Sequence, residues 1–194
     1  MEQIVIAILA GGRSRRMGRD KAALPWNGEP LLEHLAIAAL STRHLVRVIG
    51  RPQPEDWKVA GVDFLPDRYP DVGPLGGVLT ALEAGAGSIL AVACDMPHLD
   101  GLALDWLLDT ANRLPPHSPG VAARNGDQIE PLFAVYGQSL REPMRARIAA
   151  GRLSLNGLIQ DAALTLVDAP EEIRRALMNV NTPEEWRDLN RKEH

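Results

Sequence analysis

The sequence contains very little cysteine and no long apolar run. Cys94 is the single cysteine among 194 residues, which excludes an intramolecular disulfide framework and any zinc site built on cysteines. The apolar run near the N-terminus, Ile4 to Ala10, has seven residues, whereas a membrane span needs about 20. Glu2 precedes that run and the arginines follow it, the reverse of a secretory signal. We therefore expect a cytoplasmic protein without a membrane segment.

Basic residues are too few for general nucleic-acid binding. Lys and Arg together number 21 against 25 Asp and Glu, a net charge of −4. The positive charge is nevertheless concentrated near the N-terminus, in Arg13, Arg15, Arg16, Arg19 and Lys21. A basic cluster within an acidic protein predicts a local anionic ligand and no nucleic acid.

The order of the apolar segments predicts one α/β domain over residues 1–194. Strands are expected at Ile4–Leu9, Leu45–Ile49, Val62–Leu65, Ser88–Cys94, Gly120–Ala123, Leu132–Tyr136 and Leu164–Val167. Helices are expected at Glu29–Leu40, Gly73–Ala84, Leu102–Asn112, Leu140–Ala150, Ser154–Gln160 and Pro183–Leu189. This alternation predicts three α/β/α layers, with a Rossmann-like, mostly parallel sheet covered by helices on both faces. The loops at the carboxyl ends of its strands are then the expected place for a ligand.

The strongest chemical signal follows the first expected strand, where Leu9-Ala10-Gly11-Gly12 leads into the basic cluster. Glycines permit backbone angles and close approaches that a Cβ would block, and oriented amides beside cations suit a polyphosphate. The segment is neither a Walker loop nor a Rossmann fingerprint, because Gly12 and Gly18 are separated by five residues and Gly11 and Gly12 are adjacent. A tight turn followed by a solvated charged loop is the alternative interpretation.

Residues 9–21 resemble the signature loop of the nucleotidyltransferase superfamily, Leu-Ala-Gly/Ala-Gly-x-Ser-x-Arg-Met-Gly-x-x-Lys. More narrowly, the chain resembles the molybdenum cofactor guanylyltransferases, since further segments occur in that family's order over nearly the whole chain. They are Leu24–Leu32, similar to the family's hairpin into the first helix, and Gly73–Gly77, Asp95–Pro97, Glu130–Tyr136 and Asn179–Glu185.

The resemblance implies a Mg²⁺-dependent transfer of GMP from GTP to the terminal phosphate of molybdopterin. Pyrophosphate would leave, and molybdopterin guanine dinucleotide would form by positioning and charge neutralisation, without a covalent intermediate. Residues 1–100 would form the nucleotide-binding half and residues 101–194 the acceptor-binding half. Cofactor-insertion factors or molybdoenzyme chaperones are the partners that this activity would imply.

The resemblance also assigns the nucleotide site residue by residue. Leu9, Ala10, Gly11 and Gly12 match the loop that holds the nucleotide. Gly11 stands where cytidylyl-transferring relatives tend to have alanine, which favours guanine. Asp67 matches an aspartate that contacts the nucleotide after the third strand, and a loop aspartate beside a proline is the alternative.

The predicted catalytic residues are Arg16, Lys21 and Asp95. Arg16 and Lys21 match the cations that neutralise the triphosphate and the charge developing at the α-phosphorus. Solvated side chains are an equal alternative for Arg13, Arg15 and Arg19. Asp95 matches the Mg²⁺ ligand, with a turn-forming aspartate as the alternative.

Asn179 and Asn181 match a late Asn-x-Asn-Thr-Pro element that faces the reaction centre and the pterin. Thr182-Pro183-Glu184-Glu185 is also a good helix start, so turn and capping chemistry is the alternative for this segment.

The chain departs from the family at two places. Residues 46–51 contain no asparagine, although some members use one there to touch guanine, and Glu130 stands where relatives often have histidine. Basic residues of the second half could supply contacts to the pterin phosphate, and a solvated helix face is the alternative for them. These residues are Arg141, Arg145, Arg147 and Arg152.

The other conspicuous side chains receive ordinary interpretations. Cys94 is expected to be a core thiol. The histidines show no metal-binding spacing, although His98 is near enough to Asp95 in sequence to touch a substrate. The tryptophans are too scattered for a stacking platform and are expected in the core or at an interface.

Two other functions are compatible with these residues. One is a related nucleotidyltransferase, either the cytidylyltransferase of the same pterin or an enzyme acting on another acceptor such as a sugar phosphate. The other is a nucleotide-binding module without catalysis, which the presence of both Lys21 and Asp95 disfavours.

Overall fold

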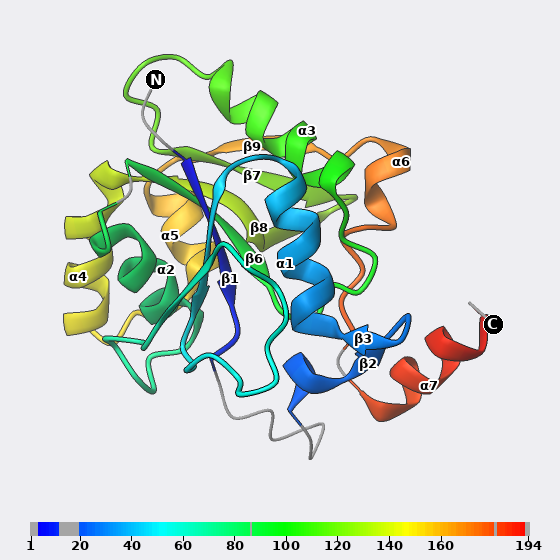
Figure 1. Cartoon of the computed structure of the whole chain (residues 1–194). Coiled ribbons are helices and arrows are strands. Elements are labelled where there is room, and N and C mark those ends of the chain that lie inside the picture. Colours follow the sequence, from blue (N-terminus) through cyan, green and yellow to red (C-terminus); the bar gives the residue numbers. More distant parts are fainter. Residues whose placement is uncertain (1–3, 12–19, 86, 181, 193–194) are drawn as a thin grey trace.

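The computed structural model describes residues 4–11, 20–85, 87–180 and 182–192. They form a seven-stranded sheet with helices packed around it (Figure 1). The strands of this sheet are β1 (Ile4–Leu9), β4 (Leu45–Ile49), β5 (Val62–Leu65), β6 (Ser88–Ala93), β7 (Gly120–Asn125), β8 (Gln128–Gly137) and β9 (Thr165–Asp168). A small hairpin adds β2 (Pro25–Trp26) and β3 (Glu29–Pro30). The helices are α1 (Leu31–Ser41), α2 (Pro74–Glu83), α3 (Gly101–Asn112), α4 (Arg141–Ala149), α5 (Leu155–Asp161), α6 (Glu171–Arg174) and α7 (Pro183–Lys192), with 3₁₀ turns η1 (Lys21–Ala23) and η2 (Gln138–Leu140).

The sheet is mostly parallel, as expected. Its strand order is β5-β4-β1-β6-β8-β7-β9. β5, β4, β1 and β6 pair in parallel, and so do β7 and β9, whereas β8 is antiparallel to both of its neighbours. A two-residue turn at residues 126–127 reverses the chain between β7 and β8, and it allows both strands to extend beyond their expected ends.

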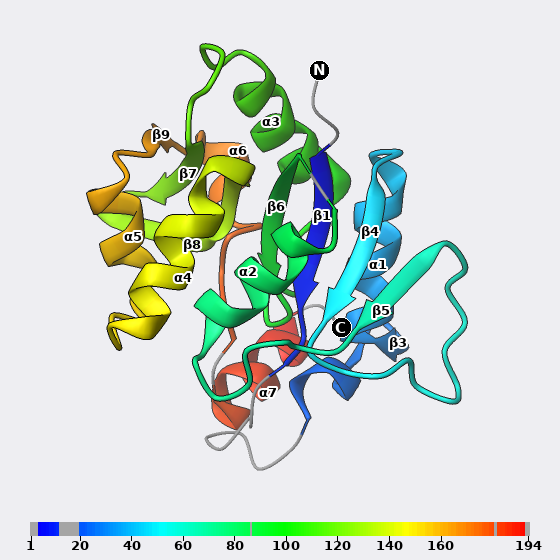
Figure 2. The same ribbon diagram turned by 90° about the vertical axis from the view of Figure 1, so that its left-hand side faces the viewer.

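Helices cover both faces of the sheet, and the central strand β1 explains why (Figure 2). All six of its residues are buried. Alternate side chains of a strand point to opposite faces, so that Ile4, Ile6 and Ile8 pack with α1 and α3, while Val5, Ala7 and Leu9 pack with α2, α4 and α5. A strand that is buried on both sides must be apolar throughout, and the three-layer α/β/α prediction is confirmed.

Most element boundaries agree with the sequence expectations, and the differences have local causes. The first helix begins at Leu31 because Glu29 and Pro30 form β3. Asn27 and Gly28 turn the chain between β2 and β3, with φ of 49° and 86°, as a hairpin turn of this length requires. The short helix α6 was not expected, since it has only four residues.

The last helix begins at the predicted cap. The Thr182 hydroxyl accepts a hydrogen bond from the Glu185 amide at 3.1 Å, and the Glu185 carboxylate accepts one from the Thr182 amide at 3.2 Å. This reciprocal pair satisfies two amides that a helix start leaves without partners. The alternative of turn and capping chemistry for this segment is therefore realised at Thr182.

Helix α7 lies beside the β2–β3 hairpin (Figure 1), and an aromatic cluster joins the two. The rings of Trp26 and Trp186 lie 5.6 Å apart, and His98 packs edge-on against Trp26 at 5.3 Å. Trp26 and Trp186 are both buried, so the expectation of core tryptophans is confirmed for them. Among the described helices, none is long and apolar enough to span a bilayer.

Two glycines let the loops after β1 and β4 touch. A Cβ on Gly50 would lie 2.5 Å from the Cα of Gly11 and 2.8 Å from its nitrogen, and the φ of Gly50 is +97°. Real Cβ contacts are essentially never so short. The close approach brings the two loops together at the carboxyl edge of the sheet.

We predict that Gly50→Ala lowers the free energy of unfolding by about 3 kcal/mol, because it combines backbone strain with a clash against backbone atoms. Gly85→Ala is the matched control, since Gly85 has a φ of +95° but no neighbour within 4 Å of the added Cβ. This control should cost only about 1 kcal/mol. Urea unfolding of both variants measures the difference, and equal losses would contradict the clash.

Candidate active site

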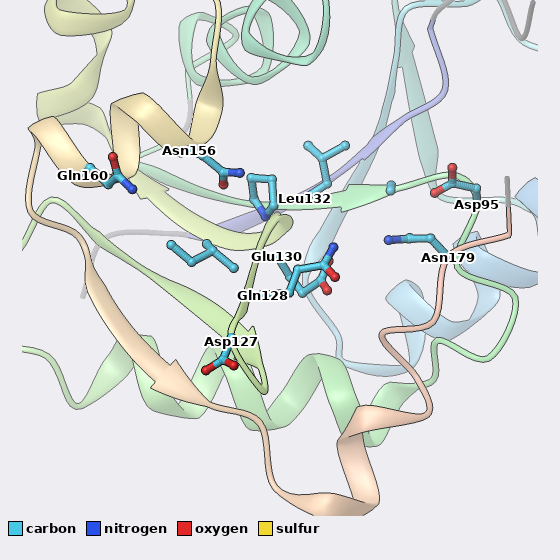
Figure 3. A pocket seen from close by; sticks show the side chains of 11 residues that line it. Asp95, Asp127, Gln128, Glu130, Leu132, Asn156, Gln160 and Asn179 are labelled. Atoms are coloured by element: carbon cyan, nitrogen blue, oxygen red, sulfur yellow. The ribbon is translucent and has the colours of Figure 1, made fainter.

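A pair of adjacent cavities opens at the carboxyl edge of the sheet. The glycine-side cavity, of about 630 Å³, is lined by Leu9, Gly11, Lys21, Ile49, Gly50, Asp67, Pro70, Asp71, Gly73, Pro74, Gly77, Ala93, Cys94, Asp95 and Leu132. The amide-lined cavity, of about 510 Å³, is lined by Ala93, Asp95, Asp127, Gln128, Ile129, Glu130, Pro131, Leu132, Asn156, Gln160 and Asn179 (Figure 3). Ala93, Asp95 and Leu132 therefore form a wall common to both.

The topology explains this position. From β1 the chain first adds β4 and β5 on one side and then returns to place β6 on the other. Loops that leave neighbouring parallel strands in opposite directions open a crevice between them. The glycine-side cavity lies at this switch point, which is where the sequence predicted a ligand.

An ion pair joins Asp95, on the common wall, to Lys21 of the glycine-side cavity. Lys21 begins η1, and Asp95 follows β6. The Lys21 Nζ lies 2.8 Å from the Asp95 Oδ2, and the two side chains are only 14% and 20% exposed. The Val180 amide also donates to the Asp95 carbonyl at 2.9 Å. Two residues that were predicted from separate motifs, 74 positions apart, thus meet at one point.

Asp67 lies in the glycine-side cavity and is held by a turn of its own. Its Oδ1 accepts hydrogen bonds from the Thr80 hydroxyl at 3.0 Å and from the Tyr69 amide at 2.9 Å. Thr80 is buried on α2. One carboxylate oxygen therefore fixes the loop after β5, and the predicted contact of Asp67 with the nucleotide stays a prediction.

The amino end of α2 forms another wall of the glycine-side cavity. Gly73, with φ +73°, precedes Pro74 at the first position of the helix, and no side chain caps it. A Cβ on Gly76 would lie 2.6 Å from the Tyr69 carbonyl oxygen. The absence of a side chain at this position therefore lets the loop after β5 pack directly on the helix.

Glu130 is the most buried carboxylate of the amide-lined cavity, with 6% of its surface exposed. Burial raises its pKa, a hydrogen bond from the Asn179 side chain lowers it, and the nearby charge of Asp95 raises it, so that the net direction is upward. Glu130, Asn179 and Asp95 thus share one wall of the cavity, as Figure 3 shows. Asn179, predicted to face the reaction centre, lines this cavity together with Asp95.

A bulge in β8 presents Glu130 to the cavity. The pairing of β7 with β8 shifts between Ala122 and Ala123, whose partners are Ala134 and Glu130. The intervening segment contains Pro131, which has no amide proton to donate to a sheet. The buried Tyr136 hydroxyl donates to the Pro131 carbonyl at 2.6 Å. Bulges of this kind redirect side chains. Pro131 and Tyr136 of the Glu130–Tyr136 motif therefore help to form the bulge that turns Glu130 toward the cavity.

The arginines of the second half are engaged elsewhere and line neither cavity. Arg145 donates to Glu83 at 2.6 Å, and Arg141 donates to the Leu82 carbonyl at 2.6 Å. Arg147 and Arg152 both pair with Asp161. Arg147 is 6% exposed, so the solvated-face alternative is wrong for it. These side chains join α4 to α2 and α5, and contacts to an acceptor phosphate are not supported.

Several residues predicted for the site do not line either cavity or fall outside the described part of the chain. Gly12, Arg13, Arg15, Arg16, Arg19 and Asn181 lie outside the described residues. Ala10 lines neither cavity, and its amide donates to the Ile49 carbonyl at 3.0 Å. His98 also lines neither cavity.

Cys94 lines the glycine-side cavity. It is partly buried and packs against the core, and burial raises the pKa of its thiol to about 12, so the thiolate is scarce at neutral pH.

Sequence reasoning missed several residues of the site. Gly50, Gln128, Asn156 and Gln160 line the cavities without having been singled out. The glycine that directly follows the second expected strand was a usable signal, since a second glycine lies there close to the end of a strand, as Gly11 does after the first. Asn156 and Gln160 lie four positions apart on α5 and therefore share a helix face, but polar residues at that spacing are common on solvent-facing helices.

Known proteins resemble this chain over nearly all of its length. Residues 6–165 match the family model of the MobA-like NTP transferase domain. A molybdenum cofactor guanylyltransferase of Xanthomonas euvesicatoria pv. vesicatoria is 36% identical, over 92% of this chain and 90% of that protein. A probable molybdenum cofactor guanylyltransferase of Opitutus terrae is 34% identical, over 97% and 95% of the two chains.

Solved structures agree on the fold. The molybdopterin-guanine dinucleotide biosynthesis protein A of Archaeoglobus fulgidus superposes with a TM-score of 0.75 at 23% identity, covering 97% of this chain and 99% of that one. A 2-C-methyl-D-erythritol 4-phosphate cytidylyltransferase of Thermus thermophilus gives 0.68 at 19% identity, covering 94% and 95%. Since enzymes named for different nucleotides share this fold, the fold alone does not select the base.

We predict that Glu130→Gln gains stability relative to the original chain as pH rises. Because the pKa of Glu130 is higher in the folded than in the unfolded chain, the folded state binds more protons between the two values. The free energy of unfolding therefore falls as pH rises through this window, from the ordinary value of 4.5 upward. The glutamine variant lacks that loss.

Urea unfolding from about pH 4 to about pH 8 measures this effect. Glu55→Gln removes the same charge from an exposed loop position and controls for net charge. Parallel stability curves for the original chain and Glu130→Gln would show that burial does not disfavour the charged carboxylate.

Proposed function

Because the chain belongs to the MobA-like NTP transferase family, we propose that it transfers GMP from GTP to the terminal phosphate of molybdopterin. An oxygen of that phosphate forms a bond to the α-phosphorus of GTP, and the bond to the β-phosphate oxygen breaks. Pyrophosphate leaves, and molybdopterin guanine dinucleotide is the product. The relatives' names support guanine as the base.

One observation carries the proposal: Asp95, which lines both cavities, pairs with Lys21 of the glycine-side cavity. The reaction must bring two polyanions together, so a cation is needed where they meet. Lys21 stands at that point and can offset charge on the reacting phosphates. Catalysis then consists of positioning and charge neutralisation.

We assign the nucleotide to the glycine-side cavity and the acceptor to the amide-lined cavity. Apart from Leu132, all residues that line the first lie within 1–100. Apart from Ala93 and Asp95, all residues that line the second lie within 101–194. This division supports the two expected halves, and it gives Leu9, Gly11, Lys21 and Asp67 to the nucleotide. Gly12 and Arg16 belong to the same proposal by resemblance.

Mg²⁺ is part of the proposal, with Asp95 as its protein ligand. Among the described residues, no group of three or more His, Cys, Asp or Glu side chains could hold a metal ion alone. Mg²⁺ is often held by one or two carboxylates together with substrate phosphates and waters, so Asp95 fits this cation. When bound, Mg²⁺ would neutralise phosphate charge. Asn179, near Asp95, and Asn181 complete the proposed reaction centre.

The cellular setting follows from the same proposal. The reaction would take place in the cytoplasm, and cofactor-insertion factors or molybdoenzyme chaperones would receive the product.

We predict that Asp95→Asn lowers kcat by about 100-fold or more, because it removes the carboxylate that holds Mg²⁺ and positions Lys21. Pyrophosphate release from GTP and molybdopterin over a range of Mg²⁺ concentrations measures the rate, and calorimetry measures Mg²⁺ binding in the presence of GTP. Asp109→Asn, which removes an exposed carboxylate 4.0 Å from Arg113, is the control. An Asp95→Asn variant with unchanged kcat and Mg²⁺ binding would remove Asp95 from the reaction.

The base preference is a separate prediction. GTP should bind more tightly than CTP or ATP in calorimetric titrations with Mg²⁺. A preference for CTP would assign the chain to the cytidylyl-transferring relatives and show that Gly11 serves packing against Gly50 alone. If the chain binds a nucleotide but does not react when the pterin acceptor is present, it is a nucleotide-binding module without catalysis.

A further inference from the structure

We propose that Glu130 selects the heterocycle of the acceptor by accepting hydrogen bonds from the N–H edge of its pterin ring. The inference rests on the proposed function, since it takes the amide-lined cavity as the acceptor site. It adds the orientation of the acceptor, with the ring at Glu130 and the terminal phosphate at the common wall.

The composition of the cavity favours a neutral, donor-rich ligand. Of the described residues that line it, Asp95, Asp127 and Glu130 are carboxylates, and none is a lysine or an arginine. Its remaining polar side chains are the amides of Gln128, Asn156, Gln160 and Asn179. A phosphate buried among carboxylates would be repelled, whereas N–H groups would find acceptors. The cation of the site, Lys21, lies on the other side of Asp95.

The basic residues of the neighbouring helix do not alter this balance. Arg141 and Arg145 are bonded to Leu82 and Glu83, and Arg147 to Asp161. A phosphate within the cavity would therefore have to break existing pairs to reach them. The end of the acceptor that meets the common wall, near Lys21, is the end that can carry its phosphate.

Glu130 is held in place before any ligand binds. It follows the turn of the β7–β8 hairpin at the edge of the bulge, and the bond from Tyr136 to the Pro131 carbonyl fixes that bulge. The Asn179 side chain hydrogen-bonds to the Glu130 carboxylate. Figure 3 shows Asn156 and Gln160 of α5 on the opposite wall from Asn179. A buried, positioned carboxylate of this kind discriminates strongly between partners that can and cannot donate to it.

The pterin ring offers the matching edge. Its 2-amino group and the adjacent ring nitrogen present two parallel N–H donors, and a carboxylate can accept both through its two oxygens. A lumazine ring, which has an oxo group in place of the 2-amino group, turns one donor into an acceptor. Glu130 should then face a carbonyl oxygen, and binding should weaken.

The test uses 6-hydroxymethylpterin and 6-hydroxymethyllumazine, which lack the phosphate and report binding by their own fluorescence. The original chain should bind the pterin at least about tenfold more tightly than the lumazine. Glu130→Gln should reduce this ratio to about one or below, because its amide can donate to the 2-oxo group. Glu55→Gln, which removes the same charge from an exposed position that lines neither cavity, should leave the ratio as it is. Calorimetric GTP binding shows that each variant is folded.

Three outcomes would overturn the inference. They are no saturable pterin binding, an unchanged ratio in Glu130→Gln, and displacement of the pterin by GMP with weaker GMP binding in Glu130→Gln. The last would mean that Glu130 reads guanine, which presents a similar N–H edge. Failure of the proposed function would look different. The chain would still bind pterin more tightly than lumazine, but it would not transfer GMP or would prefer CTP.

Discussion

The parallel pairing of β1 with both β4 and β6 is the constraint on which the site depends. It places β1 at the centre of the sheet, where all its side chains are buried and must be apolar. It also sends the loops after β1 and β4 to one edge, where Gly11 and Gly50 touch. Gly11, which the sequence motif places in a nucleotide-binding loop, therefore also packs against Gly50. A Cβ there would separate the loops before any ligand was involved.

Electrostatics then divide that edge into two unlike cavities. Lys21 brings the cation of the first loop to the end of β6, where Asp95 neutralises it in a poorly solvated position. Beyond this pair the polar lining consists of carboxylates and amides. Arg145 and Arg147 add no positive charge to it, because they pair with Glu83 and Asp161 and join helices. The two cavities are thus suited to different parts of the reactants, one to a triphosphate and the other to a hydrogen-bonding ring.

Local sequence patterns were sufficient for much of this structure, because buried parallel strands and capped helices leave short, strong signals. The bounds of β1, β4 and β5 and the cap at Thr182 follow from such signals. The bulge at Pro131 and the engagement of Arg147 depend on partners distant in the chain, and no local pattern reveals them. The resemblance identified the motifs from their order along the chain, but only the folded chain shows the ion pair between Lys21 and Asp95. The roles of Gly12, Arg16 and Asn181 stay predictions.

The contact between Trp26 and Trp186 has a consequence for synthesis of the protein. The β2–β3 hairpin leaves the ribosome early, yet its Trp26 packs against Trp186, which is synthesised about 160 residues later. During that interval the Trp26 indole lacks its contact with Trp186. Contacts this distant in the chain form late and slow folding. The hairpin is therefore a site where a nascent chain would need protection from aggregation.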